Sequence, residues 1–493
     1  MSEYILAIDQ GTTSSRVIIY NRQLKAITIA QQEVELIYPQ PGWVEQNPEQ
    51  LWQSVYNCMV TALKQAQLNA TDIAAIAITN QRETSLLWHK CTGKTLYNAI
   101  VWQDRRTAQT CLQLEQQGHL TDIQQRTGLR LDPYFSATKL AWLLDNIPDA
   151  RVAADNAELC FGTVDSYLLW RLTAGKVHAT DATNASRTLL FNLHTQEWDP
   201  KLLSLFDIPD SLLGEIKDNA AEFGYTDTNL FGSAIPIFAM IGDQQAALLG
   251  QACITPGMAK STYGTGCFSM LNTGSKVFIS QQQLISTLAW RLNAKPTYAL
   301  EGSIFMAGAI VQWLRDKLGI IQQAADTEAL AQQVPYQQSE LLIPAFTGLG
   351  APYWQPNAQA AIFGMTRNTG KAELAAAALL SVCYQSRDLL QAMAADGIAL
   401  DILRVDGGMT ENSWFLQALA DITQQPLQRC HTAETSVLGA AFLAGLQLGY
   451  FTDLSDIQQV WQANQQYNPK IPPLQADSLY QRWQDGVTAI INK

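Results

Sequence analysis

Three glycine-containing segments of this sequence carry residue types that hold phosphate groups. The first, residues 8–16, reads Ile-Asp-Gln-Gly-Thr-Thr-Ser-Ser-Arg and lies between the apolar runs 4–8 and 17–20. Backbone N–H groups of a glycine turn, together with hydroxyl side chains, form a cradle for a phosphate chain. Asp9 at the entrance of the turn could hold the metal ion that accompanies nucleotide phosphates. An ordinary hairpin with a polar tip is the alternative, and one such turn alone would favour it.

The other two segments are residues 263–267 (Tyr-Gly-Thr-Gly-Cys) and 406–412 (Asp-Gly-Gly-Met-Thr-Glu-Asn). In the last, glycines after a strand would let a flat or anionic group approach the backbone, and Asn412 could bond a base or ribose. A simple strand-to-helix turn with Thr410 as N-cap is the alternative. The sequence contains neither the P-loop nor the dinucleotide-binding glycine motif, so neither mechanism is expected.

Two further positions carry charges suited to acid–base chemistry on a hydroxyl. Arg82 and Glu83 follow the apolar run 73–78, at the strand end where ligands of α/β sheets bind. They would suit a small polyhydroxylated ligand, and a solvated ion pair is an equally favoured alternative. Asp243 precedes an alanine- and leucine-rich stretch, where it would be a good N-cap. It could also be a general base that takes a proton from a hydroxyl attacking a γ-phosphate, and one residue can serve both roles.

Two aromatic residues also allow both a structural and a functional interpretation. Trp102 comes after the strand-like run 98–101, and Tyr134 lies in the turn 131–136. Trp102 is either core packing, which is the commoner fate of a tryptophan, or an apolar wall for substrate carbon atoms. Tyr134 carries an aromatic hydroxyl and serves either packing or binding.

The elements that must position these residues fall into two similar series. Asn47 and Pro48 fit an N-cap and the first position of a helix. The sequence of the first half predicts three strands, then this helix, then a buried strand. This order is typical of an α/β unit with a mixed sheet. A similar order returns after residue 250, and residues 250–256 are a plausible hinge. The expected strands are 4–8, 17–20, 26–36, 73–78, 261–265, 269–271, 277–279, 284–290 and 402–405, and further helices are expected at 303–318 and through Leu416 and Leu419.

Bulk composition limits the function classes. A chain of 493 residues suggests two to three domains, and 47% hydrophobic with 15% charged residues can form large cores. The net charge of −12 argues against a nucleic-acid or anionic-membrane surface. Eight scattered cysteines and five histidines show no metal-ligand spacing. With no signal peptide and no run long enough to span a membrane, a soluble cytoplasmic protein is expected.

Taken together, these segments resemble the glycerol kinases, which belong to the FGGY carbohydrate kinases of the actin/hexokinase-like ATPase superfamily. The resemblance runs from about residue 4 to about residue 450, and several of its motifs are specific to glycerol kinases. The matching segments are residues 7–16, 79–84, 102–106, 161–165, 183–188, 242–247, 263–266, 347–354 and 406–408.

The resemblance implies ATP-dependent phosphorylation of glycerol to sn-glycerol 3-phosphate, with Mg²⁺. It implies an α/β fold of two actin/ribonuclease-H-like domains, with mixed sheets flanked by helices and an interdomain cleft. Residues 1–250 would bind glycerol and carry the phosphate turn, and residues 251–493 would bind the nucleotide. The expected partners are glycerol and ATP or ADP, in a homo-oligomer (dimer or tetramer), with no nucleic acid and no membrane insertion.

The resemblance also implies a role for each site residue, because these residues occupy positions that match the family's motifs. The glycerol hydroxyls would be held by Arg82, Glu83, Tyr134 and Asp243, with Gln244 beside them, and glycerol's carbon face would pack on Trp102 and Phe268. Asp243 would also be the catalytic base, and Asp9 and Asp243 would lie near the magnesium ion. The nucleotide phosphates would meet Thr12, Thr13, Ser14 and Arg16. The second domain would complete the ADP site with Thr265, Gly308, Gln312, Gly408 and Asn412.

The sequence departs from the family at regulatory positions. Residues 228–236 contain no arginine, whereas enterobacterial relatives carry there an arginine loop for fructose 1,6-bisphosphate, and the phosphorylatable histidine of Gram-positive relatives is missing too. The sequence therefore does not predict control by these routes. Two other functions stay open: a kinase for another polyol or a sugar such as xylulose, and a non-catalytic ATP-binding switch. Arg82, Glu83 and Asp243 favour an enzyme, because a switch would not need them.

Overall fold

The computed structural model describes residues 3–355, 357–432 and 434–492. Its first half is built on a six-stranded mixed sheet in the order β11-β12-β5-β1-β2-β3. The hairpin strands β1, β2 and β3 are antiparallel, β5 and β12 run parallel to β1, and β11 closes the edge antiparallel. The strands are β1 (Tyr4–Gln10), β2 (Ser14–Tyr20), β3 (Ala26–Glu33), β5 (Ile73–Asn80), β11 (Ala220–Tyr225) and β12 (Pro236–Gly242).

The second half repeats this pattern on a seven-stranded sheet in the order β15-β16-β14-β13-β19-β20-β21. Here β13, β14 and β16 are antiparallel, β19 and β20 run parallel to β13, and β21 is antiparallel. The two-domain α/β fold with mixed sheets is thus confirmed. The strands are β13 (Met258–Tyr263), β14 (Cys267–Gly274), β15 (Ile285–Leu292), β16 (Lys295–Ile304), β19 (Ile402–Asp406), β20 (Leu427–Cys430) and β21 (Ala463–Tyr467).

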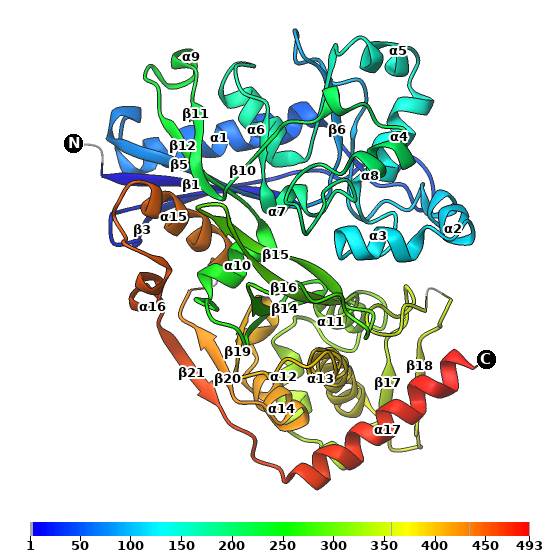
Figure 1. Cartoon of the computed structure of the whole chain (residues 1–493). Coiled ribbons are helices and arrows are strands. Elements are labelled where there is room, and N and C mark those ends of the chain that lie inside the picture. The colour runs from blue at the N-terminus through cyan, green and yellow to red at the C-terminus, as the bar shows by residue number, and fades with distance from the viewer. Residues whose placement is uncertain (1–2, 356, 433, 493) are drawn as a thin grey trace.

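Helices and short strands complete each half (Figure 1). In the first half they are α1 (Pro48–Ala66), α2 (Ala108–Gln116), α3 (Leu120–Thr127), α4 (Ser136–Asn146), α5 (Ala150–Asp155), α6 (Val164–Leu172), α7 (Ala182–Ala185), α8 (Pro200–Leu205), α9 (Thr228–Phe231), β4 (Glu45–Gln46), β6 (Leu86–His89), β7 (Ala99–Ile100), β8 (Leu159–Gly162), β9 (Ala179–Asp181) and β10 (Glu215–Lys217). In the second half they are α11 (Gly308–Asp316), α12 (Asp326–Ala331), α13 (Lys371–Ala395), α14 (Ser413–Thr423), α16 (Ile457–Val460), α17 (Pro473–Ile491), β17 (Leu341–Ile343) and β18 (Ala361–Phe363).

Two helices, α10 (Asp243–Gly250) and α15 (Thr435–Gln447), cross between the two sheets (Figure 1). Their backbones come so close that a Cβ atom on Gly250 would lie 1.9 Å from the Thr435 carbonyl oxygen. A Cβ atom on Gly439 would lie 2.0 Å from the Ala246 carbonyl oxygen. Only glycine fits at either position. Although α15 comes late in the chain, it packs against β1, β5 and β12 of the first sheet.

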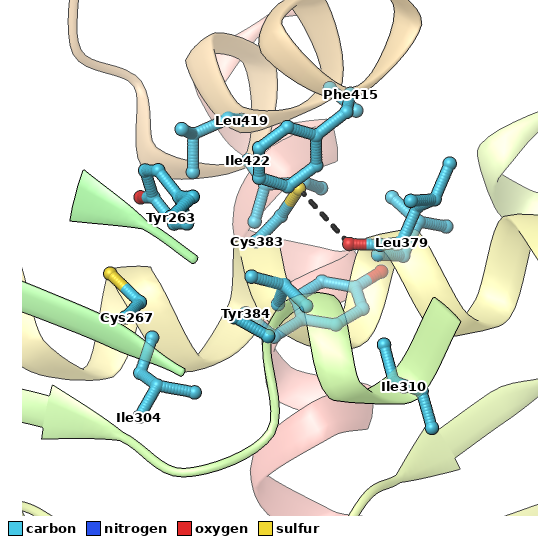
Figure 2. Packing of buried hydrophobic residues seen from close by; sticks show 14 of the residues in the cluster. Tyr263, Cys267, Ile304, Ile310, Leu379, Cys383, Tyr384, Phe415, Leu419 and Ile422 are labelled. Carbon is cyan, nitrogen blue, oxygen red and sulfur yellow. Dashed lines mark hydrogen bonds between the residues drawn. The ribbon is translucent and has the colours of Figure 1, made fainter. Parts of the chain in front are cut away.

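The core of the second half surrounds the long helix α13. Figure 2 shows Cys383 and Tyr384 of this helix among Tyr263 of β13, Ile310 of α11 and Phe415 of α14. The Cys383 thiol donates to the Leu379 carbonyl at 3.4 Å. This apolar layer supports the glycine turn that follows β13, because Tyr263 is its last strand residue.

The expected elements are mostly present. Asn47 caps α1, with its side chain accepting from the Glu49 and Gln50 N–H groups. The strand expected at 277–279 is wrong, because both neighbours of β14 are already β13 and β16. The helix expected from residue 303 begins only at Gly308, because residues 303 and 304 still pair with β14. No helix of the described residues is long and apolar enough to cross a membrane.

Candidate active site

The turn between β1 and β2 is the first of the three glycine segments. The Gly11 N–H donates to the Ser14 carbonyl at 2.9 Å, which closes the turn. Thr12 and Thr13 lie at its tip, and Ser14 begins β2. Thr12 Oγ1 accepts a hydrogen bond from Trp102 Nε1 at 2.9 Å. The predicted phosphate turn and the predicted glycerol wall are therefore in direct contact.

Asp9 and Arg16 are register partners on β1 and β2 behind this turn. Burial, reinforced by the Asp243 carboxylate, raises the pKa of Asp9 to about 7. The Arg16 guanidinium forms an ion pair with Glu434, and the two side chains are 27% and 25% exposed. Arg16 Nε also donates to Gln31 Oε1 at 3.1 Å. The cation predicted to meet the nucleotide phosphates is thus paired with a carboxylate from the other half of the chain.

Arg82 is the centre of a buried polar network at the end of β5. Its Nε lies 3.2 Å from Asp243 Oδ1, and its Nη2 donates to the Tyr134 hydroxyl at 3.4 Å. Its Nη1 donates to Gln245 Oε1 at 3.2 Å and to Glu301 Oε2 at 2.6 Å. Neighbouring negative charges, led by Glu301, hold the pKa of Arg82 above its usual value despite burial. Two of the predicted glycerol-binding side chains, Tyr134 and Asp243, therefore meet the guanidinium group of a third, Arg82.

Glu83 adopts a backbone conformation that side-chain-bearing residues rarely take. Its φ is 62°, in the left-handed region. The backbone is held there because the Glu83 carbonyl accepts hydrogen bonds from the Ser136 and Ser85 hydroxyls, at 3.1 and 3.0 Å. Its carboxylate accepts from Arg187 Nε at 2.5 Å, and burial raises its pKa. Such a backbone conformation persists only where the surrounding contacts hold it in place.

Asp243 is the first residue of α10, and Gly242 occupies the N-cap position. The expectation that Asp243 caps this helix is therefore wrong: its side chain accepts instead from the adjacent Gln244 N–H at 2.7 Å. The helix starts one residue earlier because β12 ends at Gly242. The Asp243 side chain is 29% exposed, whereas that of Arg82 is 2% exposed. Asp243 is thus the accessible end of a buried charge network.

Three aromatic rings from both halves form the apolar wall. The Trp102 ring lies edge-on to the Tyr134 ring, with centroids 5.6 Å apart, and to the Phe268 ring, with centroids 6.1 Å apart. Phe268 belongs to β14 in the second half. The structure therefore brings the three residues together.

Gln244 lies beside Asp243 and links it to a buried lysine. Its Oε1 accepts a hydrogen bond from Lys260 Nζ, which also donates to Thr262 Oγ1 at 3.0 Å. Lys260 is fully buried on β13, and burial lowers its pKa. The amide of Gln244 is therefore fixed by a side chain from the second half.

The nucleotide residues predicted in the second half line one cavity of about 370 Å³. Backbone segments that line it come close together: a Cβ on Gly308 would lie 2.6 Å from the Gly264 carbonyl oxygen. A Cβ on Gly407, whose φ is 92°, would lie 2.5 Å from the Tyr263 carbonyl oxygen. A Cβ on Gly408 would point into open space, with no atom of the described residues within 4 Å. The predicted residues in this cavity are Thr265, Gly308, Gln312, Gly408 and Asn412.

Asn412 has a structural task in the same cavity. Its Oδ1 accepts from the Phe415 N–H at 2.9 Å, which caps α14, and its Nδ2 donates to Thr327 Oγ1 at 3.2 Å. The N-cap is therefore Asn412, and the alternative assignment to Thr410 is wrong. The Thr410 hydroxyl donates instead to the Gly407 carbonyl at 2.7 Å.

The carboxylates near the phosphate turn suit a magnesium ion that arrives on a nucleotide. No group of three His, Cys, Asp or Glu residues gathers as a metal site within residues 3–355, 357–432 and 434–492. Asp243 is close enough to Asp9 for its negative charge to raise the pKa of Asp9. Mg²⁺ is commonly held by one or two carboxylates while substrate phosphates complete its shell. The donor set fits this mode of binding.

Two charged residues of the network were not assigned a role from the sequence. Arg187 is fully buried and joins Glu83 to Glu301, and Glu301 bridges Arg82 and Arg187. Arg187 lies in the matching segment 183–188. The signal for Glu301 was a single acid in an otherwise apolar run, Tyr-Ala-Leu-Glu-Gly at 298–302.

Comparisons with known proteins match the chain over nearly its full length. Residues 4–250 match the N-terminal domain, and residues 259–448 the C-terminal domain, of the FGGY family of carbohydrate kinases. The glycerol kinase of Coxiella burnetii is 55% identical over 99% of this chain and 97% of its own length. The crystal structure of Plasmodium falciparum glycerol kinase with ADP superposes with a TM-score of 0.94 at 36% identity, covering 99% of this chain and 98% of that one. A xylulose kinase from Lactobacillus acidophilus shares the fold with a TM-score of 0.89 at 23% identity, covering 99% and 98% of the two chains.

Proposed function

The chain belongs to the FGGY family of carbohydrate kinases, and we propose that it phosphorylates glycerol with ATP to give sn-glycerol 3-phosphate. One feature of the site supports a small polyol substrate in particular, and not only membership of the family. The accessible Asp243 carboxylate lies 3.2 Å from the buried Arg82 guanidinium, beside an aromatic wall that contacts the phosphate turn through Trp102. A small polyol placed there would meet a base, a cation and a phosphate cradle at once.

Recognition of the substrate follows from the polar groups around Arg82. Arg82 and Tyr134 would donate to glycerol hydroxyls, and Glu83 and Asp243 would accept from them. Trp102 and Phe268 would cover the carbon face. Because Arg82 and Glu83 are buried, a substrate lacking a matching hydroxyl would leave a buried polar group unpaired, which costs binding free energy.

Phosphoryl transfer needs positioning and charge neutralisation more than covalent chemistry. Asp243 would take the proton of the attacking hydroxyl. Thr12, Thr13, Ser14 and, after release from Glu434, Arg16 would hold the phosphates. Mg²⁺ brought by the nucleotide would neutralise phosphate charge, and Asp9 and Asp243 are the residues that would hold it. The nucleotide itself would occupy the cavity of the second half, where the five predicted residues are among those that line it.

We also propose that the two halves of the chain bind different substrates. Residues 1–250 would carry the glycerol site and the phosphate turn, and residues 251–493 the nucleotide site. The homo-oligomer expected from the resemblance stays a prediction that light scattering on the purified protein tests.

A substrate panel tests the proposal. ADP release by the purified protein is measured with glycerol, other polyols, xylulose and gluconate at saturating MgATP. We expect kcat/KM for glycerol to exceed that for every other compound. A clear preference for a pentulose would replace glycerol by that sugar, and ADP release that no compound accelerates would favour a non-catalytic switch.

A further inference from the structure

Glu301 is a charged residue in the interior of the second sheet. It lies on β16, in register with Met270 of β14 on one side and Ile285 of β15 on the other. Its side chain is 1% exposed. Two arginines of the first half surround it and lower its pKa to about 2, which overcomes the opposing effect of burial. Glu301 is therefore an ionised carboxylate on a rigid strand, aimed across the boundary between the halves.

Glu301 and Arg82 form a bidentate ion pair. Arg82 Nη1 donates to Oε2 at 2.6 Å, and Arg82 Nη2 donates to Oε1 at 3.2 Å. Two parallel bonds of this kind fix the plane of a guanidinium group. With that edge occupied, the Nε edge of Arg82 is the one that faces Asp243, at 3.2 Å.

The same carboxylate separates two cations. Arg187 Nη2 donates to Glu301 Oε1 at 2.9 Å, and Arg187 Nε holds Glu83 at 2.5 Å. Without the negative charge of Glu301, Arg82 and Arg187 would repel each other inside a buried site. Removal of one partner from a buried charge network is costly, because the remaining charge is left uncompensated.

We propose that Glu301 is a positioning residue, by which the second half orients Arg82 and Glu83 for glycerol in the first half. The glycerol site would then be complete only when β16 is docked against the first half, although Glu301 itself touches no substrate. This inference rests on the proposed function, because it concerns the same site.

The experiment distinguishes a specific effect on glycerol binding from a general loss of contact between the two halves of the chain. Asp218 provides a matched control, because it is another carboxylate that pairs with an arginine across the halves, at 2.6 Å from Arg291 Nε. Glu301→Gln, Glu301→Asp and Asp218→Asn are compared with the unaltered enzyme, varying glycerol and MgATP separately. We expect E301Q to raise KM for glycerol about 100-fold, the order of a broken buried ion pair. KM for MgATP should change less than about 3-fold, E301D should be intermediate, and D218N should resemble the unaltered enzyme.

Other outcomes overturn the inference. Unchanged KM for glycerol in a folded E301Q enzyme would refute it, and so would equal effects in E301Q and D218N. If E301Q does not fold, the stabilisation of E301D against heat by glycerol decides: it should be clearly reduced, and full stabilisation would refute the role. The unaltered enzyme in the same assay tests the proposed function separately, because absence of glycerol turnover there refutes that proposal and not the contact.

Discussion

Asp243 Oδ1 lies 3.2 Å from Arg82 Nε, and this pair joins an accessible carboxylate to a network that is otherwise buried. The Arg82 cation compensates the negative charge of Asp243 and fixes the direction of its carboxylate. Because α10 begins at Asp243 and crosses α15 between the sheets, the same carboxylate is tied to the contact between the two halves of the chain.

Asp243→Asn tests the proposed base. The substitution keeps the size of the side chain and removes its ability to take a proton. We expect kcat to fall on the order of 10³-fold, the scale of general-base catalysis. ATP binding, measured by calorimetry, should persist, because the cavity of the second half is untouched. Unchanged turnover would remove Asp243 from this role.

Gly408→Val tests the nucleotide cavity. A Cβ at residue 408 would have no atom of the described residues within 4 Å, and Gly408 lines the cavity, so the fold should tolerate a side chain that narrows the cavity. We expect the Kd for ATP to rise more than about 10-fold, since about 1.4 kcal/mol of lost contact gives that factor. Glycerol binding by the same variant is the internal control. An unchanged Kd for ATP would place the nucleotide elsewhere.

Gly439→Ala tests the helix crossing. The new methyl group would lie 2.0 Å from the Ala246 carbonyl oxygen, so α10 and α15 would have to separate. We expect the free energy of unfolding to fall by about 3 kcal/mol, the upper range for overpacking. Gly370→Ala is the control, because its Cβ would meet only Glu373 Oε2 at 3.4 Å. Equal stability of the two variants in urea would contradict the tight crossing.

The pH dependence of stability tests Asp388, whose carboxylate accepts from Tyr353, Tyr480 and Trp483 at 2.9, 2.6 and 2.9 Å. Burial raises the pKa of Asp388 to about 7. The folded protein therefore holds a proton that the unfolded chain releases near its ordinary pKa of about 4. The contribution of this proton to stability is complete below that pH and is lost as pH rises through about 7.

We therefore expect the unfolding free energy of the unaltered protein to fall between about pH 5 and pH 7 by about 2 kcal/mol more than that of Asp388→Asn. The amide introduced by this substitution has no proton to lose, although it accepts fewer hydrogen bonds and should make the variant less stable at both pH values. Denaturant titrations at the two pH values measure this difference. Parallel behaviour of the two proteins would contradict the raised pKa.

Much of the fold was readable from local patterns. The apolar runs predicted β1, β2 and β5, and Asn47 followed by Pro48 predicted the start of α1. These signals are local, because side-chain alternation and capping depend on residues a few positions apart. The predictions of a strand at 277–279 and of a helix from residue 303 were wrong because strand pairing is not a local property. The pairing of β14 with β13 and β16 decided both segments.

The sequence by itself determined the residue types at each turn and strand end, and by resemblance the family. Only the tertiary structure decided which charges meet. Glu301 and Arg82 are far apart along the chain, and no local pattern relates them. They are partners because Arg82 follows the end of β5 and Glu301 on β16 faces it across the boundary between the halves, where a buried ion needs a counter-ion.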